Sequence, residues 1–216
     1  MHRFLLHNDN VRDTTEHLLT PGQVGLLNGW GVFSTLRVFE GSLYAYPRHW
    51  ARMKRDAELL HVPFPESPDW LKERLLRLVA ANSAQDSTLR VAVVRNKGGM
   101  FESPGLATEF DLIAFTKDLK DWGTSARLAL APKTRHADHV FAGTKMLSWS
   151  FNLVLLEEAT LLPADLEKAD EVFMTSSTRD LLPVAEIEAL SLRPAGASQG
   201  VQARLLNAFR ATFGKL

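Results

Sequence analysis

The sequence predicts an α/β (α+β) protein built in two parts. Three observations favour this class. Strand-like and helix-like apolar patterns follow one another along the chain, no segment is repeated, and residues 117–123 form a polar, turn-prone stretch between two patterned halves. We therefore expect an N-terminal α/β domain at 1–120 and a C-terminal α/β domain at 121–216.

The first domain is expected to contain strands, then two helices, then further strands. Strands are predicted where apolar residues run together or alternate, at 4–7, 32–39, 89–94 and 110–115. Gly41-Ser42 marks a turn, after which 43–46 continues as a hairpin would. Helices are predicted at 49–60, after Pro47, and from Trp70 to about Asn82, because apolar residues recur there at helical spacing.

The second domain contains shorter patterned segments. Strands are predicted at 126–131, 172–175 and 181–187. Helices are predicted at 146–159 and 201–213, with a helical turn at 163–169.

Composition excludes several classes of function. Lys+Arg and Asp+Glu number 25 each, so no basic excess points to a nucleic-acid partner. The chain has no cysteine, which excludes disulfides, thiolate nucleophiles and zinc–thiolate sites. The first residues are too polar for a signal sequence, and no stretch approaches the roughly 20 apolar residues of a membrane span. We expect a cytoplasmic protein that does not associate with membranes.

Lys145 stands between a turn and an apolar segment. It follows Ala142-Gly143-Thr144 and precedes the almost uncharged run MLSWSFNLVLL. Burial at the start of an apolar helix lowers the pKa of a lysine and favours the free amine that attacks carbonyl groups. From these residues alone, a surface lysine at the edge of a helix is the simpler interpretation.

Other clusters are weaker candidates for chemistry. His136 and His139 have the spacing of a possible metal pair on a helix, but a polar loop is the simpler interpretation, and we predict no metal site. Ser176-Ser177-Thr178 lacks the neighbouring residues that would indicate a serine hydrolase.

Five segments form an ordered set spread over nearly the whole chain. They are NGWGVFSTLRV at 28–38, HWARM with Ala57 at 49–57, RVAVVRNKGG at 90–99, Lys145 with Asn152 and Glu158-Ala159, and DEVFMTSSTRDLLPV at 170–184. Together they resemble motifs of the class IV aminotransferases, which include branched-chain aminotransferase, D-amino-acid aminotransferase and aminodeoxychorismate lyase. The resemblance implies the two-domain fold of fold-type IV pyridoxal-phosphate enzymes.

The resemblance also implies a cofactor and roles for particular residues. Lys145 would bind pyridoxal 5'-phosphate covalently as a Schiff base and would move the α-proton of the substrate, with the cofactor ring as electron sink. The other implied site residues are Arg52, Ser176 and Ser177 at the cofactor phosphate and Thr35 and Arg37 on the substrate side. Each has a plainer interpretation: an exposed helix arginine, serines of a turn, and the alternation of a half-exposed hairpin.

The implied activity is amino-group transfer between amino acids and 2-oxo acids, of the branched-chain or D-amino-acid type. One alternative is the pyruvate-releasing cleavage of 4-amino-4-deoxychorismate, which uses the same lysine. A second alternative is a non-catalytic remnant of the same fold. The resemblance further implies a homodimer that acts on these small molecules.

The sequence departs from the family after Ala159. In the family, a strand ending in an acidic partner for the pyridine nitrogen follows, and then a turn that binds the phosphate at a helix N-terminus. Here Glu158-Ala159 runs directly into TLLPADLE, so the second domain looks truncated. We expect that residues are missing between Glu158 and Leu162, with a Cα spacing there well above the usual value of about 3.8 Å. The alternative is a continuous chain with a smaller second sheet.

Overall fold

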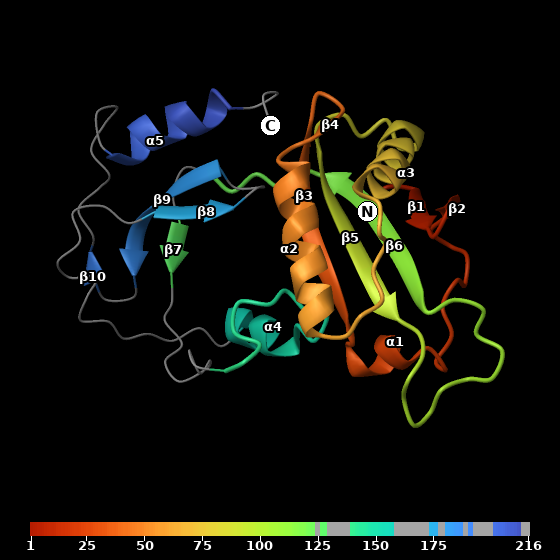
Figure 1. The fold of residues 1–216 in the computed structure, drawn as a ribbon. Helices are drawn as coiled ribbons and strands as arrows, with labels where there is room; N and C mark the ends of the chain where they lie inside the picture. The colour runs from red at the N-terminus through yellow and green to blue at the C-terminus, as the bar shows by residue number, and fades with distance from the viewer. Residues whose placement is uncertain are drawn as a thin grey trace. The chain divides into compact units, whose positions relative to one another are not determined.

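The computed structural model describes residues 1–123, 126–128, 139–157, 173–176, 180–187, 190–191 and 201–212. Within these ranges no helix has the length and apolar character needed to cross a membrane. The chain packs as two compact units (Figure 1). One comprises Met1–Leu119 with Gly143–Trp149, and the other comprises Lys120–Ala142 with Ser150–Lys215.

The first unit is built on a six-stranded sheet in which all neighbouring strands are antiparallel. Its order is β2-β1-β6-β5-β3-β4, with β1 at Phe4–His7, β2 at Asn10–Asp13, β3 at Gly31–Phe39, β4 at Ser42–Leu43, β5 at Ser87–Arg95 and β6 at Phe110–Asp118. The four strands predicted in this region are confirmed, whereas β2 was not predicted. The hairpin after Gly41 is shorter than predicted, because a helix already begins at Tyr46.

Three helices belong to this unit: α1 at Val24–Asn28, α2 at Tyr46–Leu59 and α3 at Pro68–Ala81. Pro47 lies in the first turn of α2, where a missing N–H costs nothing. Ser67 caps α3, since its side chain accepts a hydrogen bond from Trp70 N at 3.2 Å. Both predicted helices are therefore confirmed, with ends shifted by a few residues.

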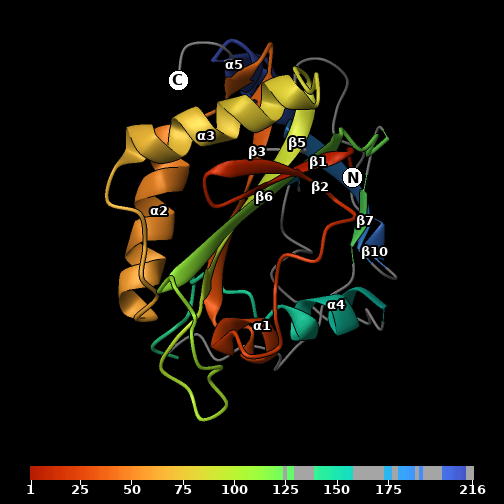
Figure 2. The ribbon, with the colours of Figure 1, turned by 90° about the vertical axis from the view of Figure 1, so that its right-hand side faces the viewer.

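Helices α2 and α3 cover one face of the sheet (Figure 2). The core between them contains apolar residues from every layer, including Met53, Ala57, Leu71, Leu75, Val32, Leu36, Leu89, Val91 and Leu112. Because side chains alternate along a strand, the residues of β3 between these core positions face the other side of the sheet. Phe33, Thr35 and Arg37 therefore lie on the face away from the helices.

The segment Gly143–Trp149 lies along the free edge of β3. Phe33 N donates to Lys145 O at 3.1 Å, and Leu147 N donates to Gly31 O at 2.9 Å. The sequence-based interpretation placed a helix from Met146 and assigned Lys145 to the second domain. The structure differs because unpaired backbone groups of β3 pair with this segment, so α4 begins only at Ser150 and ends at Glu157.

The described residues of the second unit form a small sheet and two helices. Its elements are β7 at Ala126–Leu128, α4, β8 at Phe173–Ser176, β9 at Asp180–Ile187, β10 at Leu190–Ser191 and α5 at Val201–Arg210. Strand β9 pairs with β10 and β8 in antiparallel fashion and with β7 in parallel. The predicted strands and the C-terminal helix are confirmed within the described ranges. The predicted turn at 163–169 and the predicted gap between Glu158 and Leu162 lie outside the described residues.

Candidate active site

Helix α2 presents three polar residues at helical spacing: His49, Arg52 and Asp56. Positions separated by three and four lie on one face of a helix. Asp56 is buried and His49 and Arg52 are partly buried, although they belong to a helix that otherwise exposes its charged side chains. Burial of three ionisable groups on one face requires polar partners, and β3 and the Lys145 segment supply them.

Ser34 is the partner that β3 provides. It is fully buried among the core residues of the strand, and its hydroxyl lies 2.7 Å from His49 Nδ1 and 2.7 Å from Arg52 Nη2. One hydroxyl thus joins an imidazole and a guanidinium of the same helix.

Asp56 links helix α2 to the lysine segment. Its Oδ2 accepts a hydrogen bond from Lys145 N at 3.1 Å, and its Oδ1 accepts one from Arg55 Nη2 at 2.6 Å. The carboxylate therefore holds the Lys145 backbone at a defined place beside the helix that carries Arg52.

The Lys145 amine lies over the ring of Phe33, 5.1 Å from its centroid. The same ring is contacted by Arg90, whose guanidinium carbon lies 4.8 Å from the centroid, and by the edge of the Trp149 ring at 5.2 Å. Phe33 is itself buried, so this amine is bordered by an aromatic surface. The side chain of Lys145 is partly buried, unlike the fully exposed lysine of the plainer interpretation.

The pKa of Lys145 is lowered. Desolvation by burial is the main cause, the positive charges of Arg52 and Arg90 add to it, and the negative charge of Asp56 opposes it. Two guanidinium groups near an amine favour its neutral form, which is the form that attacks a carbonyl carbon. The arrangement can therefore present a nucleophilic amine at lower pH than a surface lysine.

The neighbouring groups are shifted in the same direction. Burial, followed by the charges of Arg52 and Lys145, lowers the pKa of His49 from 6.5 to about 4. Burial also lowers the pKa of Arg52, although Asp56 opposes this. The imidazole is therefore neutral near pH 7, and the guanidinium groups of Arg52 and Arg90 give the site a positive charge that suits an anionic ligand.

Thr35 and Arg37, predicted on the substrate side, lie on β3 on the same sheet face as Phe33. Thr35 is directly opposite Arg90 of β5, and Arg90 Nε donates to Thr35 Oγ1 at 3.2 Å. Arg37 lies over the ring of Phe39, at 5.7 Å. The sheet face that carries Phe33 thus also carries the guanidinium groups of Arg90 and Arg37, and of these Arg90 shares the Phe33 ring with Lys145.

The role of the predicted serines at this cluster stays a prediction. Ser176 ends β8 in the second unit and is exposed, and Ser177 lies outside the described residues. Of the possible metal pair, His136 also lies outside them, and His139 Nδ1 accepts a hydrogen bond from Phe141 N at 3.2 Å. The described ranges hold no group of three or more His, Asp or Glu placed to bind a metal.

Sequence reasoning assigned no role to Ser34, His49, Asp56, Phe33 and Arg90. The spacing of His49, Arg52 and Asp56 contained a usable signal, because polar residues at helical spacing on an otherwise amphipathic helix indicate a buried polar stripe. Ser34 could have been noticed as a polar residue at a core-facing position of an alternating strand.

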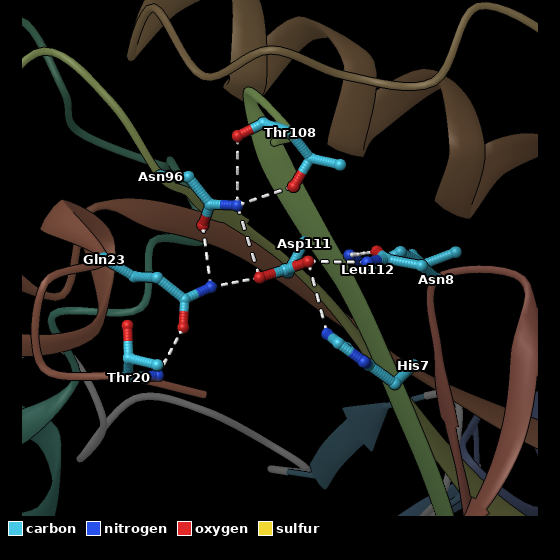
Figure 3. Close-up of polar contacts among 8 residues, drawn as sticks. All are labelled: His7, Asn8, Thr20, Gln23, Asn96, Thr108, Asp111 and Leu112. Carbon is cyan, nitrogen blue, oxygen red and sulfur yellow. Dashed lines mark hydrogen bonds and ion pairs between the residues drawn. The ribbon is translucent and has the colours of Figure 1, made fainter. Parts of the chain in front are cut away.

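A second polar cluster surrounds Asp111 at the start of β6 (Figure 3). Asn8 Nδ2 donates to one carboxylate oxygen at 2.6 Å, while Asn96 Nδ2, at 3.2 Å, and Gln23 Nε2 donate to the other. His7 Nε2 lies 3.2 Å from the same carboxylate. Burial raises the pKa of Asp111, but the nearby His7 and the hydrogen bonds from Asn8 and Asn96 outweigh this effect and lower it. All partners come from within the unit, so this cluster joins the segment before α1 to the sheet.

Residues 31–160 match the family model of the class IV amino-transferases. Among curated proteins, the chain is 30% identical over 76 residues to a chloroplastic D-amino-acid transaminase of Arabidopsis thaliana, covering 35% of this chain and 20% of that protein. It is 27% identical over 116 residues to aminodeoxychorismate lyase of Bacillus subtilis, covering 52% of this chain and 39% of the lyase. These alignments span well under half of either relative.

A third relative aligns over nearly its whole length. D-alanine aminotransferase of Bacillus licheniformis is 21% identical over 272 positions, which cover 94% of this chain and 96% of that enzyme. Since this chain has 216 residues, several dozen positions of that alignment have no counterpart here. The family match ends at residue 160, next to the point where the sequence analysis places a missing segment.

Solved structures share the fold. A branched-chain aminotransferase of Thermoproteus uzoniensis superposes with a TM-score of 0.80 at 13% identity, covering 97% of this chain and 94% of that one. A 4-amino-4-deoxychorismate lyase of Pseudomonas aeruginosa superposes with a TM-score of 0.74 at 19% identity, covering 96% and 98%. At these identities the likeness concerns the fold alone, and the predicted fold class is confirmed.

Proposed function

We propose, because the chain belongs to the class IV aminotransferases, that it is a pyridoxal-phosphate-dependent amino-acid aminotransferase of the branched-chain or D-amino-acid type. The family consists of pyridoxal-phosphate-dependent enzymes. The observation that carries the proposal is the Lys145 amine, which is packed on Phe33 and whose pKa is lowered by burial and by two guanidinium groups.

The described residues fit two groups of the cofactor. The Lys145 amine, whose pKa is lowered, suits its aldehyde, and the Arg52 guanidinium, hydrogen-bonded to Ser34, suits its phosphate. When bound, pyridoxal phosphate supplies an electron sink for a substrate that loses its α-proton. Ser176 and Ser177 are proposed as further phosphate contacts, on the strength of the sequence resemblance.

The chain's own residues then have separable tasks. Lys145 holds the cofactor and, once its amine is released, accepts and returns the proton of the substrate α-carbon, which its lowered pKa favours. Phe33 borders the amine with its aromatic ring, and Trp149 packs against that ring. Thr35, Arg37 and the neighbouring Arg90 offer hydrogen bonds and positive charge to the carboxylate of an amino acid or 2-oxo acid.

An amino-transfer assay tests the proposal. The protein is saturated with pyridoxal phosphate and supplied with single L- and D-amino acids together with pyruvate or 2-oxoglutarate. We expect a new amino acid to form only when a donor and an acceptor are both present. Lys145→Ala should abolish this transfer, whereas Lys54→Ala, which removes an exposed lysine on α2, should leave it unchanged.

The alternative activity is supported by the relatives that are lyases. A lyase would release pyruvate from 4-amino-4-deoxychorismate without any amino acceptor. The absence of both reactions, in a protein that also fails to bind the cofactor, would favour the second alternative, a non-catalytic remnant of the fold.

We also propose that the protein is a cytoplasmic homodimer. The family resemblance supports the dimer, and a net charge of zero offers little repulsion between copies. A cysteine-free composition is compatible with a reducing compartment. Light scattering of the purified protein would test the dimer directly, because a monomeric mass would contradict it.

A further inference from the structure

Ser34 forms the only polar bridge between β3 and the polar face of α2 among the described contacts of these two elements. Its oxygen is 2.7 Å from both His49 Nδ1 and Arg52 Nη2, and the residue is fully buried. His49 and Arg52 are one helical turn apart, so both reach the same hydroxyl from one side.

The chemistry of the three groups fixes which of them donates and which accepts in each hydrogen bond. A guanidinium can only donate, so the Ser34 oxygen accepts from Arg52. The hydroxyl proton then needs an acceptor in a buried place, and among the described residues the facing atom is His49 Nδ1. The order is therefore Arg52 to Ser34 to His49, with the imidazole proton on Nε2.

The Arg52 guanidinium is also attracted by a second hydrogen-bond acceptor, the carboxylate of Asp56. Asp56, one helical turn further along α2, raises the pKa of Arg52 and so attracts the guanidinium. That carboxylate already accepts from Arg55 and from Lys145 N. Without the Ser34 hydroxyl, the guanidinium would lose this hydrogen bond and would be free to turn toward Asp56.

We propose that Ser34 and His49 are positioning residues that hold the Arg52 guanidinium in one orientation for the cofactor phosphate. The inference rests on the proposed function, in which Arg52 binds that phosphate. A long side chain held in its binding orientation loses less conformational entropy when the ligand arrives, so the two residues strengthen binding without touching the ligand.

The test compares two probes on cofactor-free protein, pyridoxal phosphate and pyridoxal, each titrated by absorbance. Ser34→Ala and His49→Ala should each raise the dissociation constant of pyridoxal phosphate by roughly 3- to 10-fold, the effect of one hydrogen bond. Neither should change the constant for pyridoxal, which has no phosphate. His49→Asn, which can place an oxygen near the former Nδ1, should restore most of the lost affinity.

Arg52→Ala separates this inference from the function on which it rests. If Arg52→Ala leaves the affinity for pyridoxal phosphate unchanged, the phosphate role of Arg52 and the inference both fail. If Arg52→Ala weakens binding but Ser34→Ala and His49→Ala do not, only the inference fails. An equal loss for pyridoxal would show a merely structural effect and would also overturn it.

Two further variants complete the test. In the Arg52→Ala background, Ser34→Ala should cause no additional loss, because the residue it positions is gone. Ser34→Cys keeps nearly the same volume with a weak hydrogen-bonding group, and it replaces Ser34→Ala if that variant does not fold. It should show the same loss, confined to the phosphorylated probe.

Discussion

The neutral state of His49 makes the stability of the protein depend on pH in a defined window. The pKa of this imidazole is about 4 in the folded chain against an ordinary value of 6.5, because burial and then the charges of Arg52 and Lys145 disfavour its protonation. Between these values the unfolded chain binds a proton that the folded chain does not. Stability is therefore fully present above pH 6.5 and is lost as the pH falls toward about 4.

The size of the effect follows from the two pKa values. Between about pH 7 and about pH 4.5, His49 should reduce the free energy of unfolding by roughly 2 kcal/mol. Urea unfolding at both pH values, followed by circular dichroism, measures it. Other groups titrate as well, so the quantity of interest is the difference between the wild type and His49→Asn, which cannot bind this proton.

We expect His49→Asn to lose less stability between the two pH values than the wild type, by roughly 2 kcal/mol. His17→Asn removes an exposed histidine and should keep the wild-type dependence. Equal pH dependence of His49→Asn and the wild type would refute the reasoning, since it would mean that His49 is protonated as easily in the folded chain as in the unfolded one.

Two further predictions concern stability alone. Ser67→Ala should lower the free energy of unfolding by about 1 kcal/mol, because Trp70 N loses the cap of α3, and Ser67→Thr should lose less; urea unfolding of both variants checks this. Asp111→Ala should cost roughly 3 kcal/mol or more, because the buried amides of Gln23 and Asn96 and the partly buried amide of Asn8 lose their acceptor. Asp118→Ala, an exposed carboxylate on the same strand, is the control, and an equal effect of the two changes on urea unfolding would contradict the account.

The first unit could be predicted largely from sequence because its elements are long and strongly periodic. Strands β3, β5 and β6 each run for nine residues, and α2 and α3 for fourteen. Short elements such as β2 and α1 contain too few residues for a pattern to emerge. The start of α4 was misplaced because residues 146–149 pair with β3, a tertiary contact that an apolar run does not reveal.

In the candidate site, too, some residues could be predicted from the sequence and others could not. Lys145 and Arg52 could be singled out because the resemblance and, for Lys145, its apolar surroundings pointed to them. Ser34 and Asp56 are defined by partners on other elements, since Ser34 contacts α2 and Asp56 contacts the Lys145 backbone. Such contacts arise only when the helix packs on the sheet, so the sequence can indicate polar residues at buried positions but not the partners that they bind.

The measurement that tests the central claim most directly is the site of covalent attachment of the cofactor. The protein is incubated with pyridoxal phosphate, reduced with borohydride and digested, and the modified peptide is identified by mass spectrometry. We predict that Lys145 is the one modified residue. In Lys145→Ala, no residue should be modified to the same extent. Modification spread over exposed lysines such as Lys54, or unchanged in Lys145→Ala, would contradict the account.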